Sequence, residues 1–191
     1  MPTRPLISTV WLDDRAAAVI QSEAAARPRV ETGGALFGFG ADDELVVACA
    51  YGPGPRAKHR RSSFEPHRAT TDALIRAVWL ASDRRYRYLG SWHTHPGGSA
   101  RPSGTDLQTT ESVAKDSAVR LPRPLVLIQA TRLTPGAAAM AELRAWHWST
   151  GSEWLLPCDL EPTRLQERMC PTVAVPAGRM RKLQLLCPNA D

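Results

Sequence analysis

Two histidines separated by a single residue, His93 and His95, are the side chains of this sequence whose spacing most clearly suggests chemistry. The segment 86–95 has the pattern of a strand, and residues two apart on a strand project from the same face. Asp106 follows eleven residues after His95, in the first turn of a predicted helix, and the glycine-containing loop 96–102 can fold that turn back over the strand end. Two imidazoles and one carboxylate make the three protein ligands of a catalytic zinc site, which keeps its fourth position for water.

Each of these side chains also has a purely structural interpretation. A single histidine on a strand is often only a hydrogen-bonding residue. Ser103 and Asp106 together match a capping box, in which a serine begins a helix and an acidic residue three positions later bonds back to it. The joint occurrence of the histidine pair, a bend and this helix start nevertheless favours a metal site over separate structural roles.

A hydrolytic metal site also needs a group that moves protons, because a peptide-type leaving group must receive a proton on its nitrogen. Glu31 is the candidate, since it lies where the first predicted helix gives way to a strand, in the sequence Glu-Thr-Gly-Gly. An exposed acid at a turn is the alternative interpretation. The two glycines that follow, Gly33 and Gly34, allow the backbone to approach a ligand or a neighbouring chain closely.

The elements that must position these residues alternate along the chain. Helical patterns cover residues 13–27, 67–83 and 103–115, and strand patterns cover residues 33–40, 44–51, 86–95, 124–131 and 141–150. The first two strands form a hairpin, and residues 52–66 are predicted to be a loop with one irregular strand. Strands separated by helices indicate an α/β fold, in which helices pack on a mixed sheet.

Residues 151–191 differ in character from residues 1–150, so we predict one domain followed by a C-terminal extension. Five of the 16 prolines lie in this extension, and only the apolar run Leu183–Leu186 suggests a short helix. We expect the extension to wrap around the domain or to fold against a partner, with disorder as the alternative.

Length and composition bound the class of protein. The 191 residues are 43% hydrophobic and 23% charged, which is typical of one globular domain. No run approaches the roughly 20 apolar residues of a membrane span, and residues 1–15 lack the apolar stretch of a secretory signal. We therefore expect a cytoplasmic protein without a membrane partner. The four cysteines form no C-x-x-C pair, so neither a zinc ribbon nor a disulfide framework is indicated.

The net charge of +5 raises the question of nucleic-acid binding. The dense part of the positive charge is a patch of five basic residues: Arg56, Lys58, His59, Arg60 and Arg61. No aromatic residues are interleaved with this patch, which argues against a surface that stacks nucleic-acid bases. We therefore expect no nucleic-acid partner, and interpret the patch as a solvated loop or as a contact for an acidic partner.

Taken together, the candidate residues resemble the motif of the JAMM (JAB1/MPN/Mov34) zinc metalloprotease family, E…H-(S/T)-H-x7-S-x-x-D. Glu31, the run His93-Thr-His95 and the pair Ser103 and Asp106 fit this motif without a departure. The short chain is most similar to compact bacterial members. The resemblance implies a curved sheet between helices, related to the fold of cytidine deaminases. Deaminases themselves use H-x-E with P-C-x-x-C, which this sequence lacks.

The resemblance implies an enzyme, a zinc isopeptidase or peptidase that cuts after the C-terminal glycine of a ubiquitin-like protein. It implies one Zn²⁺ per chain, bound by His93, His95 and Asp106. Glu31 would accept the proton of a water molecule and pass it to the leaving amine. Ser103 would donate a hydrogen bond to the tetrahedral oxyanion.

The resemblance also implies partners. Compact bacterial members occur beside E1-like and E2-like proteins in anti-phage operons, so we expect a ubiquitin-like protein or its conjugate as substrate. The basic residues Arg56, Lys58, Arg60 and Arg61 are then candidates to contact that substrate. Two alternatives stay open: a hydrolase that acts on a sulfur-carrier protein in cysteine or cofactor biosynthesis, and a non-catalytic MPN scaffold.

Overall fold

Three helices and nine strands are present in the residues that the computed structural model describes, which are 6–41, 43–132 and 140–165. The helices are α1 (Asp14–Ala26), α2 (Arg68–Ala81) and α3 (Gly104–Lys115). The strands are β1 (Thr9–Asp13), β2 (Gly33–Ala41), β3 (Glu44–Tyr51), β4 (Lys58–Arg60), β5 (Ser63–Glu65), β6 (Arg87–Pro96), β7 (Leu125–Arg132), β8 (Met140–His147) and β9 (Leu156–Thr163). All three predicted helices and all five predicted strands are confirmed, with ends that shift by a few residues.

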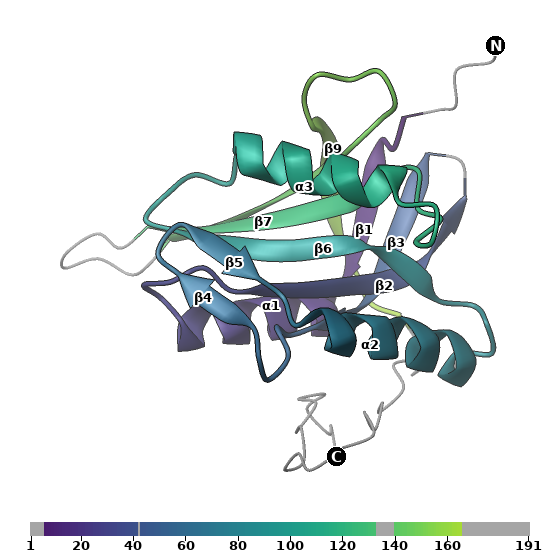
Figure 1. Cartoon of the computed structure of the whole chain (residues 1–191), viewed down its shortest axis with the longest axis horizontal. Coiled ribbons are helices and arrows are strands. Elements are labelled where there is room, and N and C mark those ends of the chain that lie inside the picture. The colour runs from purple at the N-terminus through teal and green to yellow at the C-terminus, as the bar shows by residue number, and fades with distance from the viewer. Residues whose placement is uncertain (1–5, 42, 133–139, 166–191) are drawn as a thin grey trace.

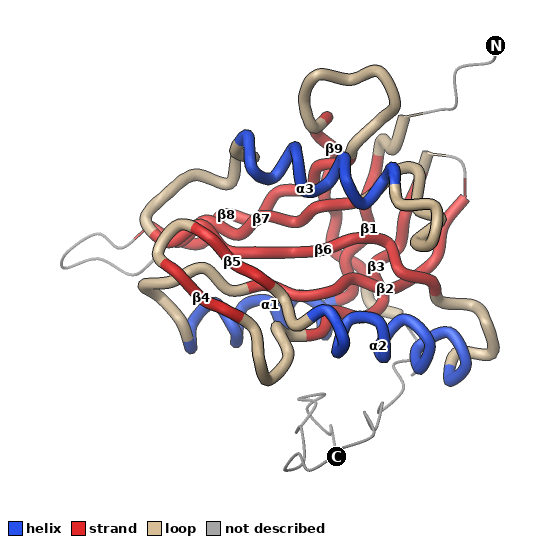
Figure 2. The backbone as a smooth tube through the Cα atoms, viewed as in Figure 1, coloured by secondary structure: helices blue, strands red, loops and turns tan. Residues whose placement is uncertain are grey.

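Seven of the strands form one closed sheet, in the order β1-β3-β2-β6-β7-β8-β9 (Figure 1; Figure 2). β2 pairs antiparallel with β3 and β6, β6 pairs parallel with β7, and β7 pairs antiparallel with β8. β9 pairs with β8 on one side and with β1 on the other, which closes the barrel. The sequence pattern predicts a mixed sheet, and the family resemblance implies that it is curved. This closure is not predicted, because β1 and β9 are not apparent from the sequence pattern.

β9 lies beyond residue 150, where the sequence pattern predicts only an extension. It is parallel to β1, and its backbone pairs with all five residues of that strand. Directly after β9, the Leu165 N–H donates to the Asp13 carboxylate at 3.0 Å, and the Leu165 carbonyl accepts from Arg15 at 2.8 Å. Part of the extension therefore belongs to the sheet. The suggested helix at Leu183–Leu186 lies outside the described residues.

The segment 52–66, predicted to hold one irregular strand, contains two. β4 and β5 pair antiparallel in a small hairpin that is separate from the barrel. Lys58 lies opposite Glu65, and their side chains form an ion pair at 3.0 Å. Figure 1 shows this hairpin at the left, in front of the sheet and next to the start of α2.

The helices cover both faces of the sheet, and neighbouring residues of β2 mark these faces. Ile20 of α1 packs in a core cluster with Leu36, which defines the inner face. Leu74 of α2 packs with Phe37, the next residue of β2, on the outer face. α3 also lies on the outer face, against Ile128 of β7. None of the described helices has the length and apolar character that crossing a membrane requires.

A bulge in β6 decides which face carries the histidine pair. The register with β2 shifts next to Gly90 and leaves Leu89 as an extra residue. Leu89 and Trp92 consequently both belong to the inner cluster, although they are three residues apart. His93 and His95 therefore project from the outer face, where α3 lies. Only glycine fits at position 90, because its φ is +143° and a Cβ would lie 1.9 Å from a backbone oxygen of β7.

A histidine and a cysteine meet where β8 pairs with β9. His147 Nδ1 lies 3.3 Å from Cys158 Sγ, and His147 is 1% exposed. Burial, with the nearby charge of Asp159, raises the pKa of the Cys158 thiol to about 12. Burial, with the positive charge of Arg123, lowers the pKa of His147 to about 4. The pair therefore consists of a neutral thiol and a neutral imidazole, which is not the ionised pair of a cysteine nucleophile.

The buried imidazole of His147 predicts a loss of stability in acid. Its pKa is lowered from the ordinary value of 6.5 to about 4 in the folded chain. Between pH 6.5 and pH 4 the unfolded chain therefore binds a proton that the folded chain does not bind. The free energy of unfolding should fall by up to about 3 kcal/mol as the pH drops from 6.5 to 4. Urea unfolding at several pH values should show that the free energy of unfolding falls less in acid for His147→Asn than for the wild type. Equal losses in the two chains would contradict the assignment.

Candidate metal centre

The outer face of β6 and the start of α3 bring three side chains to one point. His93 Nε2 lies 3.1 Å from Asp106 Oδ1, and His95 Nε2 lies 3.6 Å from Asp106 Oδ2. The two Nε2 atoms are 3.0 Å apart. The three side chains are between 12% and 16% exposed. The structure thus brings together the residues that the sequence pattern groups as candidate metal ligands.

The spacing of these atoms fits a single metal ion. In a tetrahedral zinc site with bonds of about 2.0–2.1 Å, neighbouring ligand atoms lie about 3.3 Å apart. The three distances in this site, 3.0, 3.1 and 3.6 Å, lie on both sides of that value. His95 Nδ1 lies 2.9 Å from the carbonyl oxygen of Ser99 and donates to it when it carries the proton. The lone pair of His95 Nε2 is then directed at the centre, as metal ligation requires.

Asp106 is oriented by a capping box at the start of α3. The Ser103 N–H and the Ser103 hydroxyl donate to Asp106 Oδ2, at 2.6 and 2.7 Å. In return, the Asp106 N–H donates to Ser103 Oγ at 3.3 Å. The capping bonds use Oδ2 and leave Oδ1 directed at His93. Capping and metal ligation, the two interpretations of Asp106, are therefore compatible.

The electrostatics of the site favour an ionised aspartate. Burial opposes ionisation of Asp106, but the neighbouring imidazoles of His93 and His95, with the Ser103 N–H, exceed this effect and hold the pKa of Asp106 well below the usual range. Burial likewise lowers the pKa of His95, but the nearby Asp106 carboxylate and the Ser99 carbonyl exceed that effect and raise the pKa overall. Asp106 is thus held in the charged form in which carboxylates ligate metals.

Glu31 is held next to the histidines by the start of β2. The Thr32 N–H donates to Thr94 Oγ1 at 3.0 Å, and the Thr94 N–H donates to the Thr32 carbonyl at 2.8 Å. Gly33 then pairs with His93. A Cβ on Gly33 would lie 2.3 Å from a backbone oxygen of β6, so this close approach requires glycine. Glu31 is consequently near enough to interact electrostatically with all three candidate ligands.

The β4–β5 hairpin holds the backbone of Glu31. The Glu31 N–H donates to the Arg60 carbonyl at 2.8 Å, and His59 Nδ1 lies 2.9 Å from the Glu31 carbonyl, to which it can donate. The His59 ring packs on Phe64 of β5, with ring centres 5.4 Å apart. In the sequence, His59 is only one member of a basic patch. Its contact with Glu31 depends on the pairing of β4 with β5, which no residue type in this segment signals.

The environment of Glu31 strengthens it as a base. Burial raises the pKa of its carboxyl, the two histidines lower it, and Asp106 raises it, with a net rise above the usual value. A carboxylate with a raised pKa accepts a proton more readily and can then release it to a leaving group near neutral pH.

The four basic residues predicted to contact a partner are all exposed on or beside the β4–β5 hairpin: Arg56, Lys58, Arg60 and Arg61. Lys58 is ion-paired with Glu65, so its charge is partly neutralised. Arg60 is linked to Glu31 through its backbone carbonyl, while its side chain faces solvent. The hairpin therefore joins an exposed basic surface to the residue next to the metal centre.

Replacing Ser103 with alanine is expected to have two separable effects. Loss of the helix cap should lower the free energy of unfolding by about 1 kcal/mol. Loss of the oxyanion-stabilising role that the JAMM resemblance implies for this hydroxyl should lower kcat by about 10²–10³-fold. The hydroxyl has one proton, which Asp106 accepts in this structure, so the second effect requires that the hydroxyl turn to the substrate. Kinetics and urea unfolding measure both, and Ser103→Thr, which keeps a hydroxyl, is the control. If kcat is unchanged in Ser103→Ala, the residue is only a cap.

Fold and site together define a class of protein, an α/β domain whose sheet and helix carry two histidines and one aspartate that could hold a metal ion. A sequence model of the family described as prokaryotic homologs of the JAB domain matches residues 13–149. The chain belongs to this family, as its resemblance to the JAMM motif predicts. The matched region contains every candidate site residue and ends before β9.

Several proteins are similar to this chain. A protein of Sinorhizobium fredii named probable metalloprotease y4qB is 29% identical over 121 residues, which are 62% of this chain and 74% of that protein. Two proteins named CD-NTase/cGAS isopeptidase, from Enterobacter hormaechei and Pseudomonas aeruginosa, are 32% and 37% identical over 101 and 76 residues. These matches cover 51% and 40% of this chain, and they span only 54% and 48% of the two relatives.

The fold also has a solved counterpart. The solution structure of a protein from Desulfitobacterium hafniense superposes with a TM-score of 0.59, and the match covers 82% of this chain and 94% of that one. The two sequences are 16% identical, so this likeness concerns the fold alone.

Proposed function

We propose that this protein is a zinc-dependent isopeptidase or peptidase that hydrolyses the bond after the C-terminal glycine of a ubiquitin-like protein. The observation that carries the proposal is the convergence of His93, His95 and Asp106 with Glu31 beside them. The relatives named metalloprotease and isopeptidase support a peptidase or isopeptidase role. A non-catalytic scaffold is less well supported, because a scaffold has no need of three converging ligands and a neighbouring base.

His93, His95 and Asp106 would hold the zinc ion, which when bound supplies a Lewis acid and makes water acidic enough to lose a proton near neutral pH. Glu31 accepts the proton of the attacking water on its carboxylate. It then delivers that proton to the nitrogen of the leaving amine, while the Ser103 hydroxyl donates to the oxygen of the scissile carbonyl as negative charge develops on it.

The substrate that we propose is a ubiquitin-like protein joined to a target, or its precursor, in a bacterial conjugation or anti-phage system with E1-like and E2-like proteins. The names of two relatives, CD-NTase/cGAS isopeptidase, favour this class and suggest a nucleotidyltransferase as the target. A sulfur-carrier protein is the alternative substrate. The adjacent genes separate the two, because a small β-grasp protein ending in glycine beside E1-like and E2-like genes supports conjugation.

The direct test is cleavage of two substrates of the neighbouring ubiquitin-like protein, one a linear C-terminal fusion and the other an isopeptide conjugate to a lysine peptide. The full zinc-loaded chain should release the ubiquitin-like protein with its terminal glycine intact, as mass spectrometry would show. If the zinc-loaded chain cleaves neither these substrates nor a sulfur-carrier fusion, the proposed function is wrong.

Reversing the charge of Arg60 and Arg61 to Glu should raise KM several-fold at low salt with little change in kcat. Both side chains are exposed on the hairpin that holds Glu31, where they can attract an acidic substrate surface. The rise in KM should become smaller as the salt concentration approaches 1 M, because screening shortens the range of charge interactions from about 10 Å at 0.1 M salt to about 3 Å at 1 M salt. The same reversal at Arg76 and Arg84, exposed on and after α2, is the matched control. An unchanged KM at low salt would show that the hairpin does not contribute to substrate binding.

A further inference from the structure

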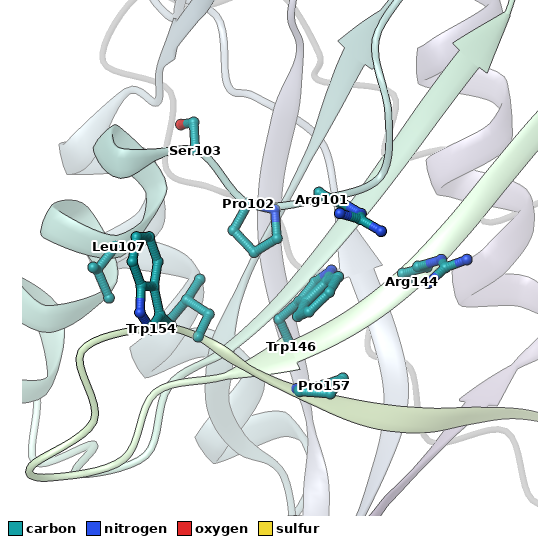
Figure 3. Close-up of a pocket in the computed structure, with 9 residues that line it drawn as sticks. Arg101, Pro102, Ser103, Leu107, Arg144, Trp146, Trp154 and Pro157 are labelled. Atoms are coloured by element: carbon teal, nitrogen blue, oxygen red, sulfur yellow. The ribbon is translucent and has the colours of Figure 1, made fainter.

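A cavity of about 340 Å³ lies next to the metal centre, between the start of α3, strand β8 and the segment that leads into β9 (Figure 3). Ser103 is part of its lining, and the same residue donates two hydrogen bonds to Asp106. Arg101 and Pro102, which directly precede Ser103, also line it. The cavity and the candidate ligands are therefore connected by one short stretch of chain.

The two ends of this cavity differ in polarity. Figure 3 shows Leu107 and Trp154 together at one end and the side chains of Arg101 and Arg144 at the other, with Trp146 between the two ends. The ligand that matches this arrangement is amphiphilic. Its apolar part would lie against the tryptophans, and its anionic part would reach the arginines.

The charges of the cavity favour a carboxylate at Arg101. Arg144 is ion-paired with Glu142, so its charge is already compensated. The guanidinium of Arg101 makes no hydrogen bond or ion pair with other residues of the described chain. A guanidinium binds a carboxylate through paired hydrogen bonds, which gives both affinity and orientation.

The two tryptophans of the cavity differ in how firmly they are held. Trp146 Nε1 donates to the Ala100 carbonyl at 2.9 Å, which fixes the indole to the loop between β6 and α3. Trp154 is 71% exposed, although Leu155 beside it is buried. Covering an exposed indole removes a large apolar area from water, so a bulky apolar side chain placed between Trp146 and Trp154 gains binding energy from both.

The sheet order places the cavity on the opposite side of the histidine strand from the β4–β5 hairpin. β6 lies between β2, which begins just after Glu31, and β7. β7 pairs in turn with β8, the strand that contains Trp146. In the proposed function the hairpin attracts an acidic surface of the substrate, and we assign this surface to the ubiquitin-like protein, whose glycine tail then approaches on the hairpin side. A substrate whose scissile bond lies at the metal centre then extends its amine side toward the cavity.

We propose that this cavity is a subsite for the amine side of the scissile bond, and that it binds a peptide segment carrying a bulky apolar side chain next to a carboxylate. The apolar side chain lies between Trp146 and Trp154, and the carboxylate accepts hydrogen bonds from Arg101. This inference rests on the proposed function, and it makes the enzyme selective for the residues that flank the modified lysine.

The test is equilibrium binding of two acceptor peptides, blocked at both ends, to the full zinc-loaded chain by titration calorimetry. Lys-Phe-Asp carries both groups that the cavity should bind, and Lys-Ala-Asn carries neither. We expect Kd to be at least tenfold lower for Lys-Phe-Asp. This preference should be lost in Trp154→Ala and reduced in Arg101→Gln, both of which change exposed side chains and so should leave the fold intact.

The matched control is Trp79→Ala, which removes a tryptophan that is 42% exposed on α2 and should leave both Kd values unchanged. Equal Kd values for the two peptides, or a preference that survives in both cavity variants, would overturn the subsite. Cleavage is measured separately with the wild type. Absence of cleavage together with a Trp154-dependent peptide preference would refute the proposed reaction, and the cavity would then be a peptide-binding site without a role in cleavage. Cleavage with equal kcat/KM for conjugates of both peptides would refute the subsite and leave the reaction standing.

Discussion

Replacing Glu31 with glutamine is expected to lower kcat by about 10³-fold while leaving the metal content and the fold unchanged. The substitution keeps the size of the side chain but removes the carboxylate that, in the proposed function, accepts the proton of water and returns it to the leaving amine. Positioned general bases contribute about 10²–10⁴-fold. The contacts that hold Glu31 in place use its backbone, through Arg60 and His59, so the variant should keep its position. Steady-state kinetics on a glycine-ended fusion, with zinc content per chain and the urea midpoint, measure the three quantities.

The matched control for this substitution is Glu44→Gln. Glu44 is exposed at the start of β3, where it pairs with Thr9 of β1, and it has no part in the proposed site. Its replacement should change none of the three measured quantities. Full activity in Glu31→Gln would show that another group moves the proton. Loss of zinc in that variant would instead make Glu31 a ligand, which the grouping of His93, His95 and Asp106 does not include.

The parts of this fold that the sequence predicts are those set by local patterns. The capping pair of Ser103 and Asp106 predicts the start of α3 to the residue, because both halves of the capping box lie within one helical turn. The β2–β3 hairpin is predicted for the same reason, since its partners are adjacent in the chain. The pair His93 and His95 shares one face because the alternation of side chains along a strand is also local.

The strands that close the barrel depend on contacts between distant residues, and the sequence carries no local signal for them. β9 contains Pro157 and Pro162, and a proline within a strand removes a backbone donor and argues against the assignment. β9 forms because β1, more than 140 residues earlier, supplies a parallel partner and because β8 supplies another. β1 has only five residues, too few for its pattern to stand out.

The site likewise has a predictable and an unpredictable part. Spacing alone groups the three candidate ligands with Ser103, but the face on which the histidines lie is decided by the bulge at Gly90. Without the extra residue in β6, the same alternation would turn both imidazoles to the inner face, among the side chains packed under α1. A glycine in a strand signals a possible bulge, and this signal is present at position 90.

Replacing His95 with alanine is expected to abolish stoichiometric zinc binding and to lower activity by at least about 10³-fold. Two ligands cannot supply the three protein donors of a catalytic zinc site, and the acidity of the attacking water then returns toward that of free water. In the absence of substrate, the free energy of unfolding of the wild-type chain should also be higher with zinc than with a chelator. The difference should be about 4 kcal/mol when the concentration of unbound zinc exceeds its Kd a thousandfold. In His95→Ala this difference should vanish. Thermal unfolding with zinc and with chelator, together with zinc content, measures both expectations.

The control variant is His67→Asn, which changes the histidine at the N-cap position of α2. Its Nδ1 bonds to Thr70 Oγ1 at 2.7 Å, and asparagine is favourable at a helix N-cap. It should keep zinc and activity.

The wild-type chain from which zinc has been removed by a chelator should regain activity with Zn²⁺ but not with Mg²⁺ or Ca²⁺. Two imidazole nitrogens and one carboxylate suit a borderline metal such as zinc, whereas Mg²⁺ and Ca²⁺ require mostly oxygen ligands. If the wild-type chain cleaves its substrate at full rate in excess chelator, a metal mechanism is excluded. The convergence of His93, His95 and Asp106 would then be a hydrogen-bonded network that orients the start of α3.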